Sequence, residues 1–198
     1  MRLKLKSSPS YIDLSDEIGR TSDVRSRAGK KAKTKGASFE RRISKSLGDW
    51  WEVKFYRTPQ SGGSHLKEGY ELAGDIATPA QDFRFHVECK NQESWSLHGL
   101  MTSPKSAVWK WWEQTLSDCP KDREPLLIFT KNHLPSFTLM YGEFLDMVIC
   151  DYLSSEGKFE DRSRITVGDV SIITLDSFLS IPKSAFISTF QQSEALHG

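Results

Sequence analysis

The 198-residue sequence has few cysteines, no long apolar run and almost no excess charge of either sign. Its three cysteines, Cys89, Cys119 and Cys150, are an odd number without paired spacing, which argues against a disulfide framework or a zinc site and favours a reducing compartment. No apolar run approaches the roughly 18 residues of a transmembrane helix. The first residues, MRLKLKSSPS, lack the apolar centre of a signal peptide. We therefore expect a cytoplasmic protein with no membrane partner.

The net charge of +1 does not by itself indicate a polyanionic partner, but the distribution of charge does. Residues 1–36 are polar and basic, and the run RSRAGKKAKTK within them contains no acidic residue. With little periodicity, this segment is expected to be a flexible arm rather than a packed element. Lys30, Lys31 and Lys33 would then contact a nucleic-acid backbone. The alternative is a solvated tail that aids solubility.

The segment Phe83–Cys89 alternates apolar and polar residues, and this period of two predicts a half-buried β-strand. Glu88 and Lys90 would leave its polar face side by side, with their Cα atoms about 6.5–7 Å apart. Asp75 lies upstream, after Gly74, which permits a tight bend. A strand, a turn and a second strand would bring Asp75 back beside Glu88.

Two carboxylates that converge beside a lysine suit a divalent cation. Mg²⁺ prefers oxygen ligands and usually takes one or two protein carboxylates, with water and phosphate oxygens completing its shell. It can lower the pKa of a bound water and stabilise charge on a phosphodiester, and a nearby lysine can position the nucleophile or neutralise the transition state. An isolated Glu88–Lys90 pair on an exposed strand would contribute very little, so the interpretation depends on the neighbouring motifs.

Asp75 followed by Glu88-Cys89-Lys90 resembles the PD-(D/E)xK nuclease signature. Two upstream segments are similar to those of one branch, the archaeal-type Holliday junction resolvases and their phage relatives. GASFER at 36–41 resembles their opening-helix motif G-x-x-[FY]-E-R, and RTPQSGGS at 57–64 resembles the Arg/Ser/Gly loop that follows it. Motif order and spacing agree over residues 36–131, about half the chain.

The resemblance implies an α/β fold with a restriction-endonuclease-like core, in which a small mixed β-sheet is flanked by helices in the order α-β-β-β-α-β. Residues 37–141 would form this core after the arm of residues 1–36. Residues 142–198 depart from the family pattern and are expected to be a C-terminal α/β extension packed on the core, which completes the sheet, forms a dimer interface or binds a partner. Local patterns predict a helix capped by Ser38, with an apolar stripe of Phe39, Ile43, Leu47 and then Trp50 or Trp51. They also predict strands at Val53–Arg57, Pro125–Thr130 and Ser136–Tyr141.

The resemblance also implies roles for the site residues. Asp75, Glu88 and the carbonyl of Cys89 would hold Mg²⁺, for which Mn²⁺ could substitute, and Lys90 would orient or activate the attacking water. Glu40 would be a third acidic group near the metal, although at a helix start it has the simpler role of stabilising the helix dipole. DNA phosphates would be held by residues of the opening helix and the loop, namely Arg41, Arg42, Arg57, Ser61 and Ser64. The alternative for that loop is an ordinary hairpin connection.

After a linker predicted at Asn91–Ser103, a further helix is predicted over Pro104–Asp118, where three tryptophans recur within four residues. Core packing is the favoured interpretation of Trp109, Trp111 and Trp112, with a subunit contact or base stacking as alternatives. Gln114 on the same helix could point back at the metal site.

The sequence therefore predicts a Mg²⁺-dependent endodeoxyribonuclease, a phosphodiester hydrolase that resolves four-way DNA junctions in DNA recombination and repair. Symmetric cutting of a junction needs two active sites, so a homodimer is implied. The resemblance suggests a phage source and hence a host cytoplasm. One alternative is a PD-(D/E)xK nuclease of other specificity, such as a restriction-like, flap-cutting or DNA-end-processing enzyme. The other is a non-cleaving DNA-binding protein on the same fold, which the joint presence of Asp75, Glu88 and Lys90 argues against.

Overall fold

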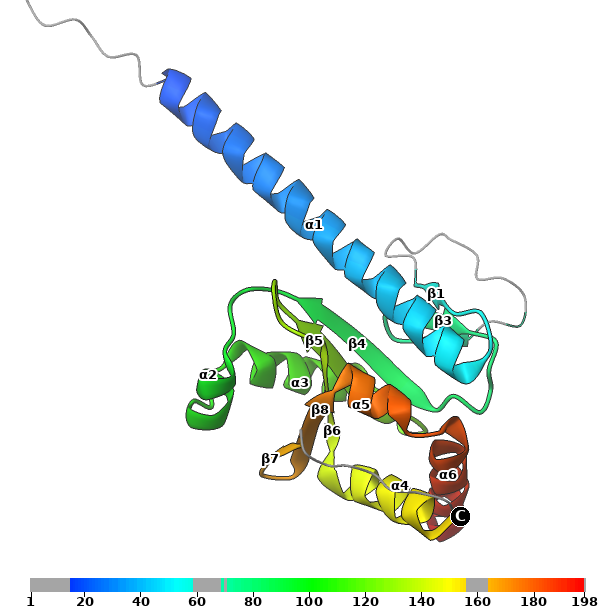
Figure 1. Cartoon of the computed structure of the whole chain (residues 1–198). Coiled ribbons are helices and arrows are strands. Elements are labelled where there is room, and N and C mark those ends of the chain that lie inside the picture. The colour runs from blue at the N-terminus through cyan, green and yellow to red at the C-terminus, as the bar shows by residue number, and fades with distance from the viewer. Residues whose placement is uncertain (1–14, 59–68, 70, 156–163, 198) are drawn as a thin grey trace, which may run out of the picture. The chain divides into compact units, whose positions relative to one another are not determined.

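The computed structural model describes residues 15–58, 69, 71–155 and 164–197 (Figure 1). The chain forms two compact units, Met1–Lys35 and Gly36–Gly198. Helix α1 (Ser15–Trp51) begins in the first unit, so the predicted helix start at Ser38 is wrong. The residues before Ser38 are rich in Ala, Lys and Arg, which are strong helix formers. The helix can therefore extend upstream of the first core-facing side chain.

The end of α1 within the second unit carries the apolar stripe that its spacing predicts. Phe39, Ile43, Leu47 and Trp51 recur every four residues and are at most 2% exposed. The neighbouring Trp50 donates its indole N–H to the carbonyl of Ile181, 2.9 Å away. This hydrogen bond ties the helix to the C-terminal part of the chain.

The second unit contains two β-sheets. The larger has the strand order β4-β5-β6-β8-β7, in which β4 and β5 are parallel and the other pairs are antiparallel. The smaller is antiparallel, with the order β1-β3-β2. The strands are β1 (Tyr56–Arg57), β2 (Glu71–Ala73), β3 (Ile76–Thr78), β4 (Phe85–Asn91), β5 (Glu124–Thr130), β6 (Phe137–Tyr141), β7 (Ile165–Val167) and β8 (Val170–Thr174). This mixed α/β arrangement agrees with the expected restriction-endonuclease-like fold.

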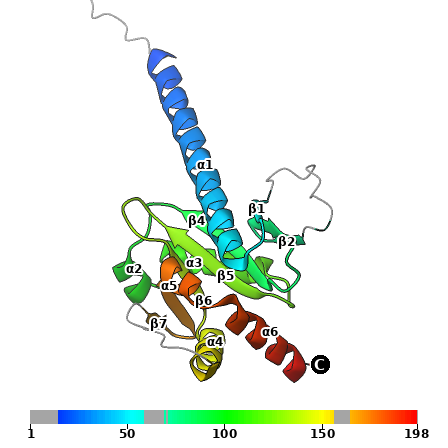
Figure 2. The same cartoon turned by 45° about the vertical axis from the view of Figure 1, so that its right-hand side comes forward.

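Helices cover both faces of the larger sheet (Figure 1; Figure 2). One core cluster joins the end of α1 to α4 (Gly142–Ser155), α5 (Leu175–Ser180) and α6 (Lys183–His197). A second cluster lies on the other face, under α2 (Leu97–Thr102) and α3 (Ala107–Asp118). Helix α2 falls in a segment predicted to be a linker. Its signal was Ser96, whose side chain accepts a hydrogen bond from the N–H of Gly99 and caps the helix.

Strand β4 is more buried than its alternating sequence predicts. All five residues from Phe85 to Cys89 are buried, including His86 and Glu88, each 8% exposed. The polar face of β4 meets α3 instead of solvent. The prediction of a half-buried strand is therefore wrong for this part of β4.

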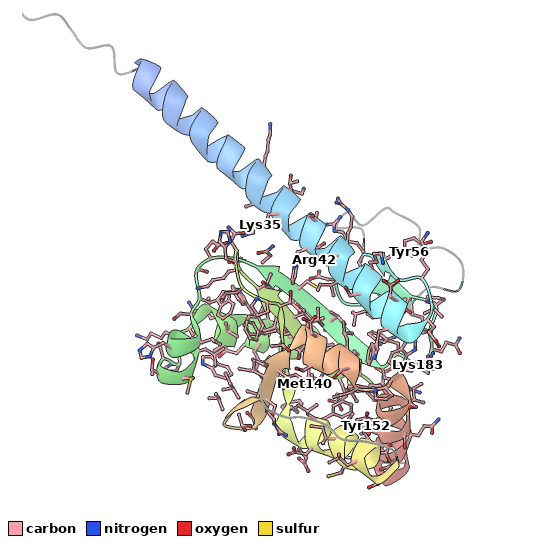
Figure 3. The ribbon with its side chains drawn as sticks, viewed as in Figure 1. Lys35, Arg42, Tyr56, Met140, Tyr152 and Lys183 are labelled. Atoms are coloured by element: carbon pink, nitrogen blue, oxygen red, sulfur yellow. The ribbon has the colours of Figure 1, made fainter. Side chains whose placement is uncertain are left out.

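The C-terminal residues complete the larger sheet, which is one of the three roles left open for them. β8 pairs with β6 along its whole length, and β7 adds the outer strand. Phe178 and Phe186 are fully buried in the same cluster as α1. Lys183 donates to the carbonyl of Trp51 at 3.2 Å, beside the end of α1 (Figure 3). Among the described residues, no helix combines the length and the apolar character needed to cross a bilayer.

Candidate active site

Asp75 lies at the tip of the β2–β3 hairpin, whose connecting turn is only Gly74 and Asp75. Gly74 has a φ of +77°, a conformation that side chains other than glycine rarely adopt. A Cβ atom at this position would also lie 2.2 Å from the carbonyl oxygen of Val87 on β4. The glycine therefore lets the hairpin tip contact the edge of β4 directly.

Two hydrogen bonds fix Asp75 on that edge. Its N–H donates to the carbonyl of Val87 at 2.8 Å, and its Oδ2 accepts from the N–H of Cys89 at 2.8 Å. The other side of the turn is held by Thr58, which donates its N–H to the carbonyl of Asp75 and its hydroxyl to that of Gly74. The sequence patterns do not predict that Thr58 holds this turn. The one feature of the sequence that points to Thr58 is its position directly after Arg57 in the loop motif.

Asp75 thus lies beside β4 as expected, but the contact that places it there differs from the one expected. The contact is a parallel bridge between Gly74 and Val87, made by the turn itself rather than by a neighbouring antiparallel strand. In an extended strand the N–H and C=O of one residue face the same side. The carbonyl of Cys89 therefore faces the same edge as the N–H that binds Asp75.

The Cys89 thiol cannot replace that carbonyl as a ligand. Its side chain is 8% exposed within the core cluster that includes α1. Burial, with smaller contributions from Asp75 and other nearby carboxylates, raises the pKa of the thiol well above its usual range. The backbone of Cys89 is the part that reaches the site.

Glu88 and Lys90 lie side by side on β4, as the sequence predicts. The Lys90 ammonium is 2.5 Å from Oε1 of Glu88, and both side chains are mostly buried, at 18% and 11% exposure. The ammonium also donates to Oε1 of Gln114 on α3, at 3.2 Å. Gln114 therefore points toward the site, where it contacts Lys90.

Glu40 comes to the site from α1 and is 7% exposed. Its carboxylate accepts a hydrogen bond from Nε of Arg57 on β1 and forms an ion pair with it. Arg57, which we expected to bind phosphate, is thus the counter-ion of Glu40. Glu40 interacts electrostatically with Asp75, so α1 does add a third carboxylate to this region.

The pKa of Asp75 is raised from 3.8 to about 7. Burial is the largest cause, followed by repulsion from Glu88, with a smaller repulsion from Glu40. The hydrogen bond from the N–H of Cys89 and the charge of Lys90 act in the opposite direction without cancelling the shift. Burial therefore disfavours the charged form of Asp75. In the part of the chain that the structure describes, three carboxylates, Asp75, Glu88 and Glu40, also share this region with only two cationic groups, Lys90 and Arg57, a balance that a bound cation would correct.

The donor set fits a small divalent cation. Across residues 15–58, 71–155 and 164–197, no three carboxylate, histidine or cysteine side chains already stand together as a metal cluster. Glu88 and Glu40 are instead turned to Lys90 and Arg57. When a cation replaces the Lys90 ammonium at Glu88, the protein would offer two carboxylates, Asp75 and Glu88, together with the carbonyl of Cys89. Such a small ligand set suits Mg²⁺, because this ion keeps several waters.

The other predicted DNA contacts are only partly described. Arg41 is exposed and lines a groove of about 620 Å³ along α1. The guanidinium of Arg42 lies 5.1 Å from the ring centre of Phe39 (Figure 3). Lys30 and Lys33 are exposed on α1 within the first unit. The Lys31 side chain, Ser61 and Ser64 lie outside the described residues.

The tryptophans of α3 belong to the core, as favoured from the sequence. Trp111 and Trp112 are 8% and 5% exposed in the second cluster, and the indole of Trp109 donates to the carbonyl of Leu100 at 3.0 Å.

His86 shares the face of β4 with Glu88 but is buried, and burial lowers its pKa.

Comparison with known proteins identifies the family of this chain. No curated protein and no solved structure matches the chain significantly. The family model described as phage putative PDDEXK endonuclease matches residues 31–188, which include Glu40, Asp75, Glu88, Lys90 and most of the C-terminal extension. PDDEXK nucleases generally use divalent metal ions. The chain belongs to the phage putative PDDEXK endonuclease family and thereby to the PD-(D/E)xK nuclease superfamily.

Proposed function

We propose that this chain is a Mg²⁺-dependent, structure-selective endodeoxyribonuclease that resolves four-way DNA junctions as a homodimer. The observation that carries the nuclease assignment is the position of Asp75, which is bound to the N–H of Cys89 and interacts electrostatically with the Glu88–Lys90 pair of β4. The junction specificity is supported by the resolvase-like segments 36–41 and 57–64.

Asp75, Glu88 and the carbonyl of Cys89 would hold Mg²⁺ or Mn²⁺. When bound, the ion would lower the pKa of a water and stabilise the charge that develops on the phosphodiester. Lys90 has three N–H donors, of which Glu88 and Gln114 take two. The third can donate to the attacking water or to a phosphate oxygen. Hydrolysis would break one P–O bond of the backbone as the water oxygen forms the new bond to phosphorus.

Arg57 would exchange partners when DNA binds. Its guanidinium neutralises Glu40 in the structure, and a phosphate offers the same paired acceptor geometry. Transfer of Arg57 to the phosphate would release the Glu40 carboxylate to the cation or to its bound waters. Arg41, Arg42 and the lysines of the N-terminal segment would contact phosphates farther from the cut.

Cleavage of a labelled four-way junction tests the proposal, beside linear duplex, flap and single-stranded DNA, each with Mg²⁺ and with EDTA. Paired symmetric nicks on the junction alone would support junction resolution by a dimer. The control is Asp75→Asn, which keeps the side-chain volume and should bind the junction without cutting it. Cutting of every substrate would refute junction selectivity while leaving the metal site intact.

A PD-(D/E)xK nuclease of other specificity is the second candidate. It is favoured by the family match, which reaches Ser188 and so includes a C-terminal part that the compact resolvase pattern lacks. A non-cleaving DNA-binding protein is separated from both by calorimetry, because a protein without a working site would not bind Mn²⁺.

A further inference from the structure

Arg123 lies in the turn before β5, outside every motif noted in the sequence. Its side chain is 13% exposed although it carries a full charge. Nη1 donates to the carbonyls of Phe83 and Phe85, at 3.3 and 3.4 Å, and Nη2 donates to the carboxylate of Glu71, at 2.9 Å. One guanidinium thus connects the turn before β5, the edge of β4 and the start of β2.

The same edge of β4 carries the metal-site contacts. Alternate residues of an extended segment direct their N–H and C=O to one side. Along this edge, Arg123 binds the carbonyls of Phe83 and Phe85, and Asp75 then binds the carbonyl of Val87 and the N–H of Cys89. The two residues occupy consecutive parts of one strand edge.

The hairpin is therefore fixed to β4 at two points. Its tip is held by Asp75, and its root is held by Glu71, the first residue of β2, through Arg123. β2 has only three residues, so its root and its tip are joined by a short, stiff segment. A change at the root would be transmitted to the carboxylate at the tip.

We propose that Arg123 is a positioning residue for the metal site, which holds the Asp75 hairpin in register on β4. The inference rests on the proposed function, because it assumes that Asp75 is a metal ligand. A guanidinium is suited to this role because its fixed fork of donors can serve two carbonyls and a carboxylate at once. A lysine has a single charged nitrogen, which cannot lie within hydrogen-bond distance of all three acceptors in the places that the two Nη atoms of Arg123 occupy.

Calorimetric titration with Mn²⁺ alone, together with thermal melting of each variant, tests the proposal. Arg123→Gln should weaken Mn²⁺ binding about 10-fold, since loss of groups that orient metal ligands typically costs 10- to 100-fold in affinity. Arg123→Lys should fall between the wild type and this variant. Glu71→Ala leaves the β4 carbonyl contacts in place and should weaken binding by a smaller factor, about 3-fold.

Arg164→Gln is the matched control. Arg164 is similarly buried, at 15% exposure, and pairs with Asp146 of α4 at 2.5 Å and with Ser171, so its loss disturbs the C-terminal part without touching the hairpin. Equal losses of affinity in Arg123→Gln and Arg164→Gln would overturn the proposal, since they would show general destabilisation. Unchanged affinity in both Arg123→Gln and Glu71→Ala would also overturn it. Failure of the wild type to bind Mn²⁺ would instead refute the proposed function, and the inference with it.

Discussion

Asp75→Asn should inactivate the protein and yet stabilise its metal-free form at high pH. Burial and Glu88 raise the pKa of Asp75 from 3.8 to about 7, so the folded chain holds this proton more tightly than the unfolded chain does. The stabilisation from proton binding is complete below about pH 4 and is lost as the pH rises through 7. Asparagine has no such charge to bury. Its side-chain oxygen can still accept from the N–H of Cys89, and its NH₂ can donate to the neighbouring carboxylates.

The size of the effect follows from the two pKa values. Each pH unit between these two values lowers the free energy of unfolding of the wild type by about 1.4 kcal/mol, so the complete loss is at most about 4 kcal/mol. Asp75 is only partly shielded from water, and solvent screening reduces the expected difference to about 2 kcal/mol. For a chain of this length, that corresponds to a rise in melting temperature of about 4–8 °C.

The assay is thermal melting of the wild type and Asp75→Asn in EDTA, at several pH values between 4 and 8. The two curves should coincide near pH 4 and separate progressively toward pH 8, with the variant more stable. Mg²⁺ or Mn²⁺ should then stabilise the wild type alone at pH 8. The exposed Asp122 gives the control, because Asp122→Asn should not produce this separation. An Asp75→Asn variant that melts at or below the wild-type temperature at pH 8 would refute the reasoning.

Three further predictions concern the turn and the catalytic groups. Gly74→Ala should destabilise the fold by about 3 kcal/mol in urea unfolding, because of the positive φ at this position and the clash of the new Cβ with β4. The control is Gly29→Ala, on α1 with open space around it, which should be neutral or slightly stabilising. Equal effects of the two substitutions would contradict the turn geometry. Glu40→Gln removes the ionic partner of Arg57. It should lower the cleavage rate more at limiting Mg²⁺ than at saturating Mg²⁺. If Glu40 were only structural, the ratio of the variant rate to the wild-type rate would be the same at both Mg²⁺ concentrations. Lys90→Ala should abolish cleavage while leaving DNA binding within about 2-fold in a gel-shift titration, and loss of binding in parallel with activity would assign Lys90 to DNA contact instead.

The sequence predicts the elements of this site better than their arrangement. Alternation in Phe83–Cys89 correctly places Glu88 beside Lys90, and the four-residue spacing of α1 correctly identifies its buried stripe. Both are local patterns, which depend only on the period of a strand or a helix. They are visible without knowledge of the fold.

The arrangement depends on contacts between distant residues, and these have no local signal. The parallel bridge from Gly74 to Val87 and the Arg123 contacts join segments that are far apart in the chain. The same limit explains the error about β4, since only the position of α3 shows that its polar face is covered. The start of α1 differs from the prediction for another reason. Ser38 is a suitable capping residue, but the helix propensity of the basic run before it extends the helix upstream.

The most direct test of the central claim is cleavage of a labelled four-way junction by the wild type, Asp75→Asn and Lys90→Ala, in Mg²⁺ and in EDTA. We expect cleavage by the wild type in Mg²⁺ only, with both variants bound to the junction but inactive. Cleavage by either variant at the wild-type rate, or by the wild type in EDTA, would contradict the assignment of a metal-dependent active site to the edge of β4.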